Sequence, residues 1–150
     1  MKIDGVDELT AELERVMHGL NYAPTFRLLR LPAGLSLEAA QAAVIATYPQ
    51  ATFPNPILSD VDTLWDEIDY GFHYRGDTGS GLTLSLAEET RLQDLQERYR
   101  GFARSSIGPG SVIYTGGFAG LPGYPVFWDF RYVVLNEDRN GLLLFGSASD

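Results

Sequence analysis

The chain has 150 residues, with 11 Lys and Arg against 20 Asp and Glu for a formal net charge of −9, and it has no cysteine. Without cysteine, disulfides, thiolate nucleophiles, iron–sulfur clusters and cysteine-based zinc sites are excluded. The negative charge opposes contact with nucleic-acid phosphates, and the single lysine, Lys2, excludes nucleotide-binding P-loops and lysine Schiff bases in interior elements.

The size and apolar content predict one globular domain over residues 1–150, since about 150 residues is close to the most common domain length. The longest apolar runs, at 42–46 and 142–145, are far shorter than the ~18 residues that a membrane span requires. The N-terminus turns acidic at once and lacks the apolar stretch of a secretory signal. We therefore expect a cytoplasmic protein that has no membrane partner.

The first part of the chain predicts two helices joined by a strand. Apolar residues within 6–20 recur at helical spacing, and Asp4 is the expected N-cap of this helix. Residues 25–31 predict a short strand, which the following proline and glycine stop. Ser36 is the expected cap of the second helix, and Pro49 ends it because proline lacks the N–H that a helix needs.

The middle of the chain predicts a short helix, a hairpin and a long helix. Residues 60–69 place their apolar side chains on one helical face. The alternation of residues 70–75 predicts a strand that pairs with 82–84 across a glycine-rich turn. A capping box formed by Ser85 and Glu88 then opens the long helix.

The C-terminal part predicts a strand at 111–115, a long flexible or bent loop at 116–125, and a hairpin of 126–135 with 142–145. Helices and strands alternate early, but hairpins dominate the second half. We therefore predict an α+β fold, in which an antiparallel sheet of hairpins packs against three or four helices as a single pair of layers.

The strongest functional feature is an acidic and aromatic segment. Residues 60–69 hold five of the twenty carboxylates and no basic residue, and aromatic side chains among carboxylates can anchor an Arg- or Lys-rich partner. The alternative is that Trp65 lies in the core and the carboxylates only face water. The candidate partner-binding residues are Asp60, Asp62, Trp65, Asp66, Glu67, Asp69 and Tyr70.

We expect the chain to be a non-catalytic module that docks a basic protein, as small bacterial antitoxin and immunity proteins do, with no cofactor and no metal. The comparison is with that class of protein only, and it rests on size, acidity, and the lack of cysteine and of a catalytic set. Asp60 and Asp62 do not start a calcium loop, because Trp65 stands where such a loop requires glycine.

A small enzyme or ligand-binding protein is the main alternative. Its pocket would lie under the loop at 116–125. A third alternative is a structural homodimer subunit, in which exposed Trp and Tyr residues form the interface. The polar groups expected in the pocket of the enzyme alternative are His73, Asp77, Asp129 and Arg131.

The tetrapeptide at 77–80, Asp-Thr-Gly-Ser, resembles the catalytic signature of aspartic proteases. In that family two such carboxylates share a proton. Here a helix is predicted from Ser85, where the family continues in strands, and the match covers only the tetrapeptide. A glycine-rich hairpin turn, in which Asp and Gly tolerate positive φ, is therefore the preferred interpretation.

Overall fold

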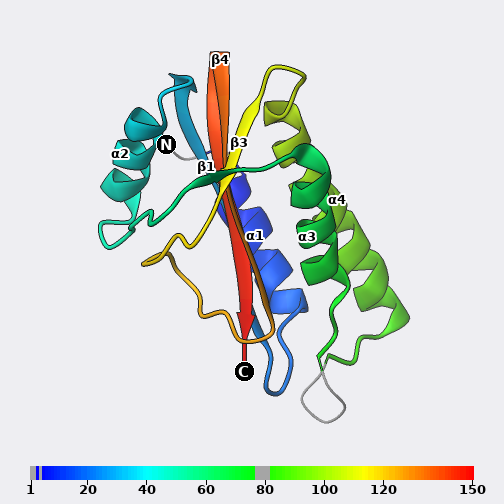
Figure 1. Cartoon of the computed structure of the whole chain (residues 1–150). Helices are drawn as coiled ribbons and strands as arrows, with labels where there is room; N and C mark the ends of the chain where they lie inside the picture. The colour runs from blue at the N-terminus through cyan, green and yellow to red at the C-terminus, as the bar shows by residue number, and fades with distance from the viewer. Residues whose placement is uncertain (1–2, 4, 77–81) are drawn as a thin grey trace.

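The computed structural model describes residues 3, 5–76 and 82–150. Within these residues the chain forms four helices and one four-stranded antiparallel sheet, whose strand order is β1-β4-β3-β2 (Figure 1). The predicted α+β fold with an antiparallel sheet is confirmed. None of the helices in the described residues has the length and apolar character needed to cross a bilayer.

The elements follow one another along the chain in the order α1, β1, α2, β2, α3, α4, β3 and β4. Their bounds are α1 Val6–Val16, β1 Ala23–Gly34, α2 Leu37–Thr47, β2 Ile57–Leu58, α3 Val61–His73, α4 Leu86–Ser106, β3 Val112–Thr115 and β4 Trp128–Ser149.

The central element, β4, folds back on itself. Its residues 132–135 pair with β3, whereas its residues 140–149 pair with β1. Between the two halves, the Asn136 side-chain amide donates a hydrogen bond to the Asn140 carbonyl over 3.0 Å. This is the predicted C-terminal hairpin, but its second half runs to Ser149 instead of ending at 145.

The two faces of the sheet are covered differently (Figure 1). Side chains alternate along a strand, so Phe130 and Leu144 of β4 join the core under α1, α3 and α4. Val133 and Phe145 point the other way and join a second core that includes α2 residues. The helices therefore form one full layer on the first face, while α2 covers only part of the second.

Two helix starts are set by the predicted side-chain caps. The Ser36 hydroxyl accepts a hydrogen bond from the Ala39 N–H at the start of α2. At the start of α4, Ser85 and Glu88 form the reciprocal capping box. The predicted cap of the first helix, Asp4, lies outside the described residues, and Gly5 occupies the N-cap position of α1.

The predicted strand at 70–75 is wrong. Residues up to His73 continue α3, because Phe72 extends the spacing of Leu64 and Ile68 and all three are buried against the sheet. Residues 82–84 form no strand, although the Leu82 N–H donates to the Arg75 carbonyl over 2.7 Å. The turn expected between them, at 77–81, lies outside the described residues.

Strand β1 is longer than predicted, since it continues through Pro32 and ends at Gly34. It lies at the edge of the sheet, where a missing proline N–H costs no ladder hydrogen bond. The pairing with β4 also shifts between Leu31 and Ala33 and again at Gly34. A bulged edge therefore accommodates the residues that were expected to end the strand.

One glycine allows α3 to approach β4 closely. A methyl group on Gly71 would lie 2.9 Å from two carbon atoms of the Trp128 ring. We predict that Gly71→Ala destabilises the protein by about 1–3 kcal/mol, because helix or ring must move. Gly101→Ala in α4, where a methyl group meets nothing within 4 Å, is the matched control and should stabilise by ~0.5–1 kcal/mol.

Urea unfolding of both variants measures these free energies. If the two substitutions change stability in the same direction and by similar amounts, the close approach of α3 to Trp128 does not limit the packing.

Buried tyrosines make the fold sensitive to high pH. Burial raises the pKa of the Tyr22 phenol to about 12, and the Tyr22 oxygen accepts a 2.6 Å hydrogen bond from Trp128 Nε1. Burial also raises the pKa of Tyr99, whose hydroxyl donates to the Arg27 carbonyl. In the unfolded chain these phenols ionise near their ordinary value of 10.0. The unfolded state therefore loses protons first as the pH rises.

We predict that the free energy of unfolding is independent of these groups below about pH 10 and falls between about pH 10 and 12. Urea unfolding at increasing pH measures the slope. Tyr99→Phe should reduce that slope, because it removes one phenol that the folded state keeps protonated. Tyr124→Phe, at an exposed position, is the control. A stability that does not change across this window would contradict the prediction.

Candidate functional site

Helix α3 holds the predicted acidic segment, and its first carboxylate caps the helix. The Asp60 carboxylate accepts a 2.8 Å hydrogen bond from the Thr63 N–H. This backbone hydrogen bond holds the pKa of Asp60 below its usual range, because it stabilises the charged form. Asp60 therefore acts first as a helix cap.

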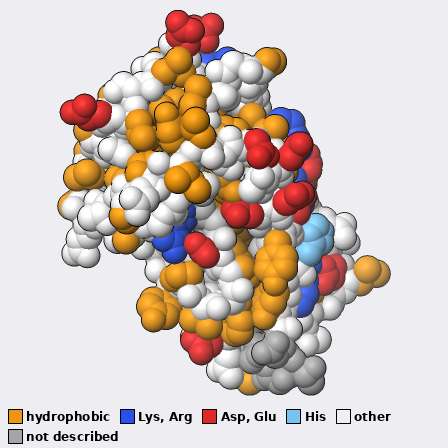
Figure 2. All heavy atoms as spheres, in the orientation of Figure 1, with side chains coloured by type: hydrophobic (Ala, Val, Ile, Leu, Met, Phe, Trp, Pro, Cys, Tyr) orange, Lys and Arg blue, Asp and Glu red, His pale blue; other side chains and the backbone are white. Residues whose placement is uncertain are grey.

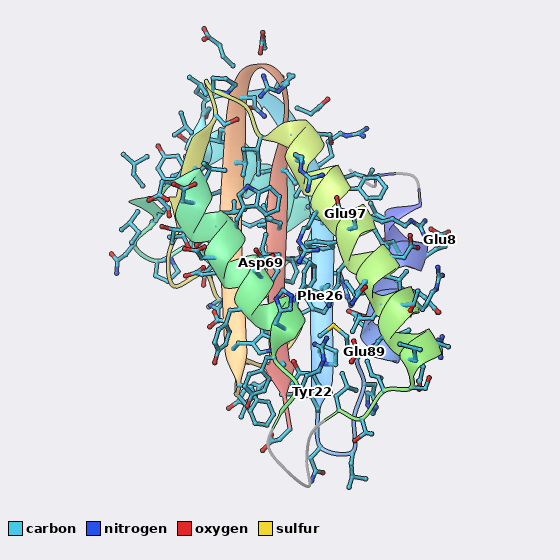
Figure 3. The ribbon with its side chains drawn as sticks, turned by 90° about the vertical axis from the view of Figure 1, so that its right-hand side faces the viewer. Glu8, Tyr22, Phe26, Asp69, Glu89 and Glu97 are labelled. Carbon is cyan, nitrogen blue, oxygen red and sulfur yellow. The ribbon has the colours of Figure 1, made fainter. Side chains whose placement is uncertain are left out.

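Two further carboxylates fasten α3 to its neighbours. The Tyr132 hydroxyl of β4 donates a hydrogen bond to Glu67, and burial together with this contact raises the pKa of Tyr132. Asp69 accepts hydrogen bonds from Arg100 of α4, at 3.1 Å from Nε and 2.9 Å from Nη2. Figure 3 shows Asp69 on the side of α3 that faces α4. The Arg100 guanidinium also lies over the Phe72 ring.

Asp62 and Asp66 are different, because both are exposed and neither has an ion-pair partner among the described residues. They are four residues apart and so lie one turn from each other on the same side of the helix. Carboxylates gather over α3 in the space-filling view (Figure 2). Asp62 and Asp66 are therefore the carboxylates of the acidic segment that no ion pair or hydrogen bond to a neighbour engages in the described residues.

Aromatic residues flank these charges. Tyr70 is 58% exposed, four residues beyond Asp66. Trp65 is half-buried, and the Arg104 guanidinium lies 5.9 Å from the centre of its ring. Trp65 therefore belongs partly to the core and partly to the surface.

The edge of the sheet beside α3 presents apolar side chains. Strand β2 is the last strand of the sheet, and its two residues, Ile57 and Leu58, are 57% and 70% exposed. Next to them lies an open groove of about 480 Å³, lined on one side by residues 59–61 and on the other by residues around Pro109. Apolar and acidic surface thus meet at the N-terminal end of α3.

The residues of the enzyme alternative are dispersed. His73 is exposed at the C-terminal end of α3, and its Nδ1 lies 2.8 Å from the Asp69 carbonyl oxygen. Asp129 and Arg131 form an ion pair of 3.1 Å, and Arg131 lies on the sheet face opposite α3, with Phe118 and Phe145. Asp77 lies outside the described residues.

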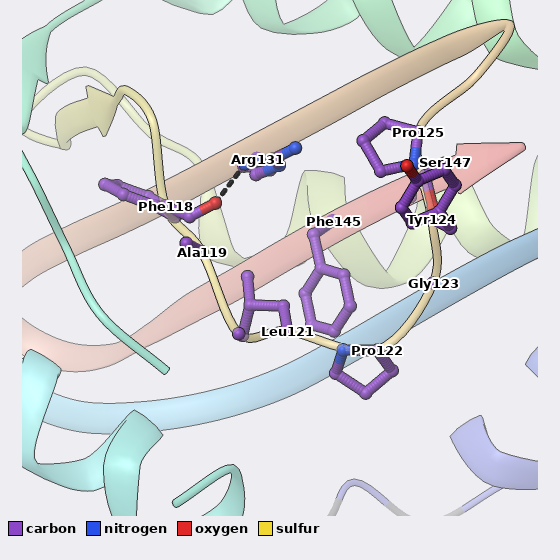
Figure 4. A pocket seen from close by; sticks show the side chains of 12 residues that line it. Phe118, Ala119, Leu121, Pro122, Gly123, Tyr124, Pro125, Arg131, Phe145 and Ser147 are labelled. Atoms are coloured by element: carbon purple, nitrogen blue, oxygen red, sulfur yellow. Dashed lines mark hydrogen bonds between the residues drawn. The ribbon is translucent and has the colours of Figure 1, made fainter. Parts of the chain in front are cut away.

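A cavity of about 240 Å³ lies under the loop that precedes β4 (Figure 4). Its roof is formed by residues 118–125, and its floor by Phe145, Gly146 and Ser147 of β4. Arg131 lines it as well and donates a hydrogen bond to the Phe118 carbonyl. Within the described part of the chain, this cavity and the α3 surface are on opposite faces of the sheet.

The loop over this cavity is fixed at both ends. Ala119 and Thr52 exchange two backbone hydrogen bonds of 2.8 and 2.9 Å, and the Phe118 and Phe53 rings pack edge to face with centres 5.0 Å apart. Farther along, the Val126 N–H donates to the Ala148 carbonyl over 2.9 Å. The glycine-rich loop is therefore bent and anchored to its neighbours.

The comparisons with known proteins concern the fold. The chain is similar to a crystal structure of citrus MAF1, with a TM-score of 0.57 and 11% sequence identity, over 97% of this chain and 98% of that chain. A second crystal form of citrus MAF1 aligns with a TM-score of 0.49 at 11% identity, over 94% and 98% of the two chains. The likeness is one of fold only. No protein-family model and no curated protein sequence matches the chain.

Sequence reasoning identified the acidic segment and the loop but missed Ser147, which the structure places on the cavity floor. The signal available in the sequence is that small residues at 146–148 follow the apolar run at 142–145, while residues 116–125 are rich in glycine and proline. Small side chains on both sides of a gap leave it unfilled. In the described residues, no group of three or more His, Asp or Glu side chains is arranged to hold a metal ion.

Proposed function

We propose that the protein is a non-catalytic binding module that docks a basic protein through the outer face of α3. This face comprises Asp62, Trp65, Asp66 and Tyr70. The observation that carries the proposal is that Asp62 and Asp66 stand one turn apart without a cationic partner in the described residues, whereas the other three carboxylates of the segment are each engaged.

The electrostatics of α3 favour a cationic partner. Like charges at i and i+4 on a helix are mutually unfavourable by a few tenths of a kcal/mol, and Arg or Lys side chains placed between Asp62 and Asp66 relieve that repulsion. The formal charge of −9 adds a long-range attraction for a basic protein, which raises the rate of encounter. This attraction weakens with salt, as the Debye length falls from about 10 Å at 0.1 M to about 3 Å at 1 M.

Apolar anchors supply the part of the interface that salt does not screen. Tyr70 presents a large, rigid ring beside the charges, and tyrosine is enriched among residues that dominate binding energy. At the other end of α3, Ile57 and Leu58 of β2 add exposed apolar surface next to the groove. A basic protein with an apolar side chain next to its Arg or Lys residues is the kind of partner that fits both features.

The decisive experiment is a charge reversal on α3. Asp62→Lys combined with Asp66→Lys should weaken binding of the basic partner by about tenfold or more, equivalent to about 1.4 kcal/mol. The matched control is Glu38→Lys combined with Glu137→Lys, which changes the net charge equally at exposed positions away from α3. Each protein is immobilised, proteins from native lysate are captured at low and high salt, and the affinity of a recovered partner is then measured.

The proposal requires that the wild type and the control retain the same basic protein, that the α3 reversal loses it, and that high salt weakens its retention. Circular dichroism and urea unfolding must show that the reversed protein is folded. Equal retention by the α3 reversal and the control, or the absence of any basic protein retained by the wild type, would overturn the assignment.

A further inference from the structure

The cavity under residues 118–125 contains a polar group that the fold leaves unpaired. The Ser147 side chain is only 6% exposed, and its hydroxyl oxygen has no hydrogen-bond partner among the described residues. A buried hydroxyl without a partner is a net cost to the fold, because it has lost its hydrogen bonds to water. In a cavity wall, such a group is satisfied by whatever fills the cavity.

The roof of the cavity is shaped around this hydroxyl. Gly123 has a φ of +95°, and a methyl group on it would lie 2.4 Å from Ser147 Oγ. The hydroxyl therefore lies directly beneath the loop backbone at a position where a side chain does not fit. Figure 4 shows Ser147 and Arg131 on either side of Phe145, with Leu121 and Pro122 facing the Phe145 ring.

The second polar group of the cavity, Arg131, is already neutralised. Its guanidinium pairs with Asp129 over 3.1 Å and donates to the Phe118 carbonyl. A guanidinium has five N–H donors, and the partners seen in the described residues involve only its two terminal nitrogens. The cavity thus offers hydrogen-bond donors without net positive charge, in a protein whose formal charge of −9 repels anions.

The Tyr124 phenol also lines the cavity, and the other walls are apolar or backbone. Together they set the size of the occupant. A cavity of about 150 Å³ holds benzene. The cavity of about 240 Å³ here therefore has room for a ring of that size with a short polar substituent. Phe118, Leu121 and Phe145 provide the apolar contact surface.

We propose that this cavity is a binding site for a small, neutral, mainly apolar molecule that carries a hydrogen-bond acceptor, such as an aryl ketone. The acceptor accepts a hydrogen bond from the Ser147 hydroxyl, and the apolar body lies against Phe145. The site is on the sheet face opposite α3, so it is independent of the proposed docking surface.

Three probes of similar size test the chemistry of the ligand. Acetophenone carries a ring and a neutral acceptor, ethylbenzene has the same shape without the acceptor, and benzoate carries a negative charge. In titrations of the whole chain followed by amide NMR, acetophenone should give saturable shifts confined to 118–125 and 145–147. Ethylbenzene should bind at least about threefold more weakly, which is the lower range for one lost hydrogen bond. Benzoate should also bind more weakly, because the cavity offers no net positive charge to balance its carboxylate.

Ser147→Ala tests the role of the hydroxyl through two readouts that should move in opposite directions. Acetophenone should bind about three- to tenfold more weakly, whereas the melting temperature of the ligand-free protein should rise, because an unpaired buried hydroxyl has been removed. If Ser147 only supported the fold, replacing it would lower the melting temperature. Ser149→Ala, on the same strand and away from the cavity lining, is the control and should change neither quantity.

Three results would overturn the proposal: no saturable shift at the cavity with any probe, binding of ethylbenzene or benzoate as tight as that of acetophenone, or unchanged acetophenone affinity in Ser147→Ala. The α3 charge reversal should leave acetophenone binding unchanged. Failure of the docking proposal and failure of this one are therefore separate outcomes.

Discussion

The contact between α3 and the folded-back β4 determines where both candidate sites lie. Leu64, Ile68 and Phe72 turn one side of α3 into the core, and Gly71 allows the helix backbone to reach the Trp128 ring. With that side fixed, helical geometry leaves Asp62 and Asp66 no direction other than outward. A helix held at a greater distance could rotate, and its charged face would not be defined.

The same hairpin supports the second site because its side chains alternate. The alternation that places Phe130 and Leu144 under the helices places Arg131, Phe145 and Ser147 on the other face. Helix α2 covers only part of that face, so the loop at 118–125 has to cover the rest. A loop without regular side-chain packing covers a sheet less completely than a helix, and the cavity lies where glycine and serine face each other across this gap.

The sequence predicts most of the framework, since its signals are local. Capping residues such as Ser36 and Ser85 act on backbone groups three residues away, and the C-terminal hairpin follows from strand alternation around a polar turn. The strand at 70–75 fails because Tyr70, Phe72 and Tyr74 alternate, while Phe72 also continues a helical spacing that starts at Leu64. Burial against β4 decides between the two patterns. Because β4 is far from α3 in the sequence, a local sequence pattern cannot reveal this contact.

The candidate sites show the same division between local and long-range information. The excess of carboxylates at 60–69 is visible in the sequence, but which of them are free is not, because Glu67 is engaged by Tyr132, 65 residues later, and Asp69 by Arg100, 31 residues later. The unpaired state of Ser147 depends likewise on a loop that the chain forms before it reaches β4.

In the proposed docking, the three engaged carboxylates contribute indirectly. Asp60 fixes the start of α3, Glu67 ties its middle to β4, and Asp69 ties its last turns to α4. A helix fastened at these points holds Asp62, Asp66 and Tyr70 in fixed relative positions before any partner arrives. Because ordering flexible groups on binding costs free energy, a prearranged pair of charges beside a rigid ring binds a matching basic surface better than the same residues on a mobile segment. In the proposed docking, the contacts that engage these three carboxylates thus make the two remaining charges more effective.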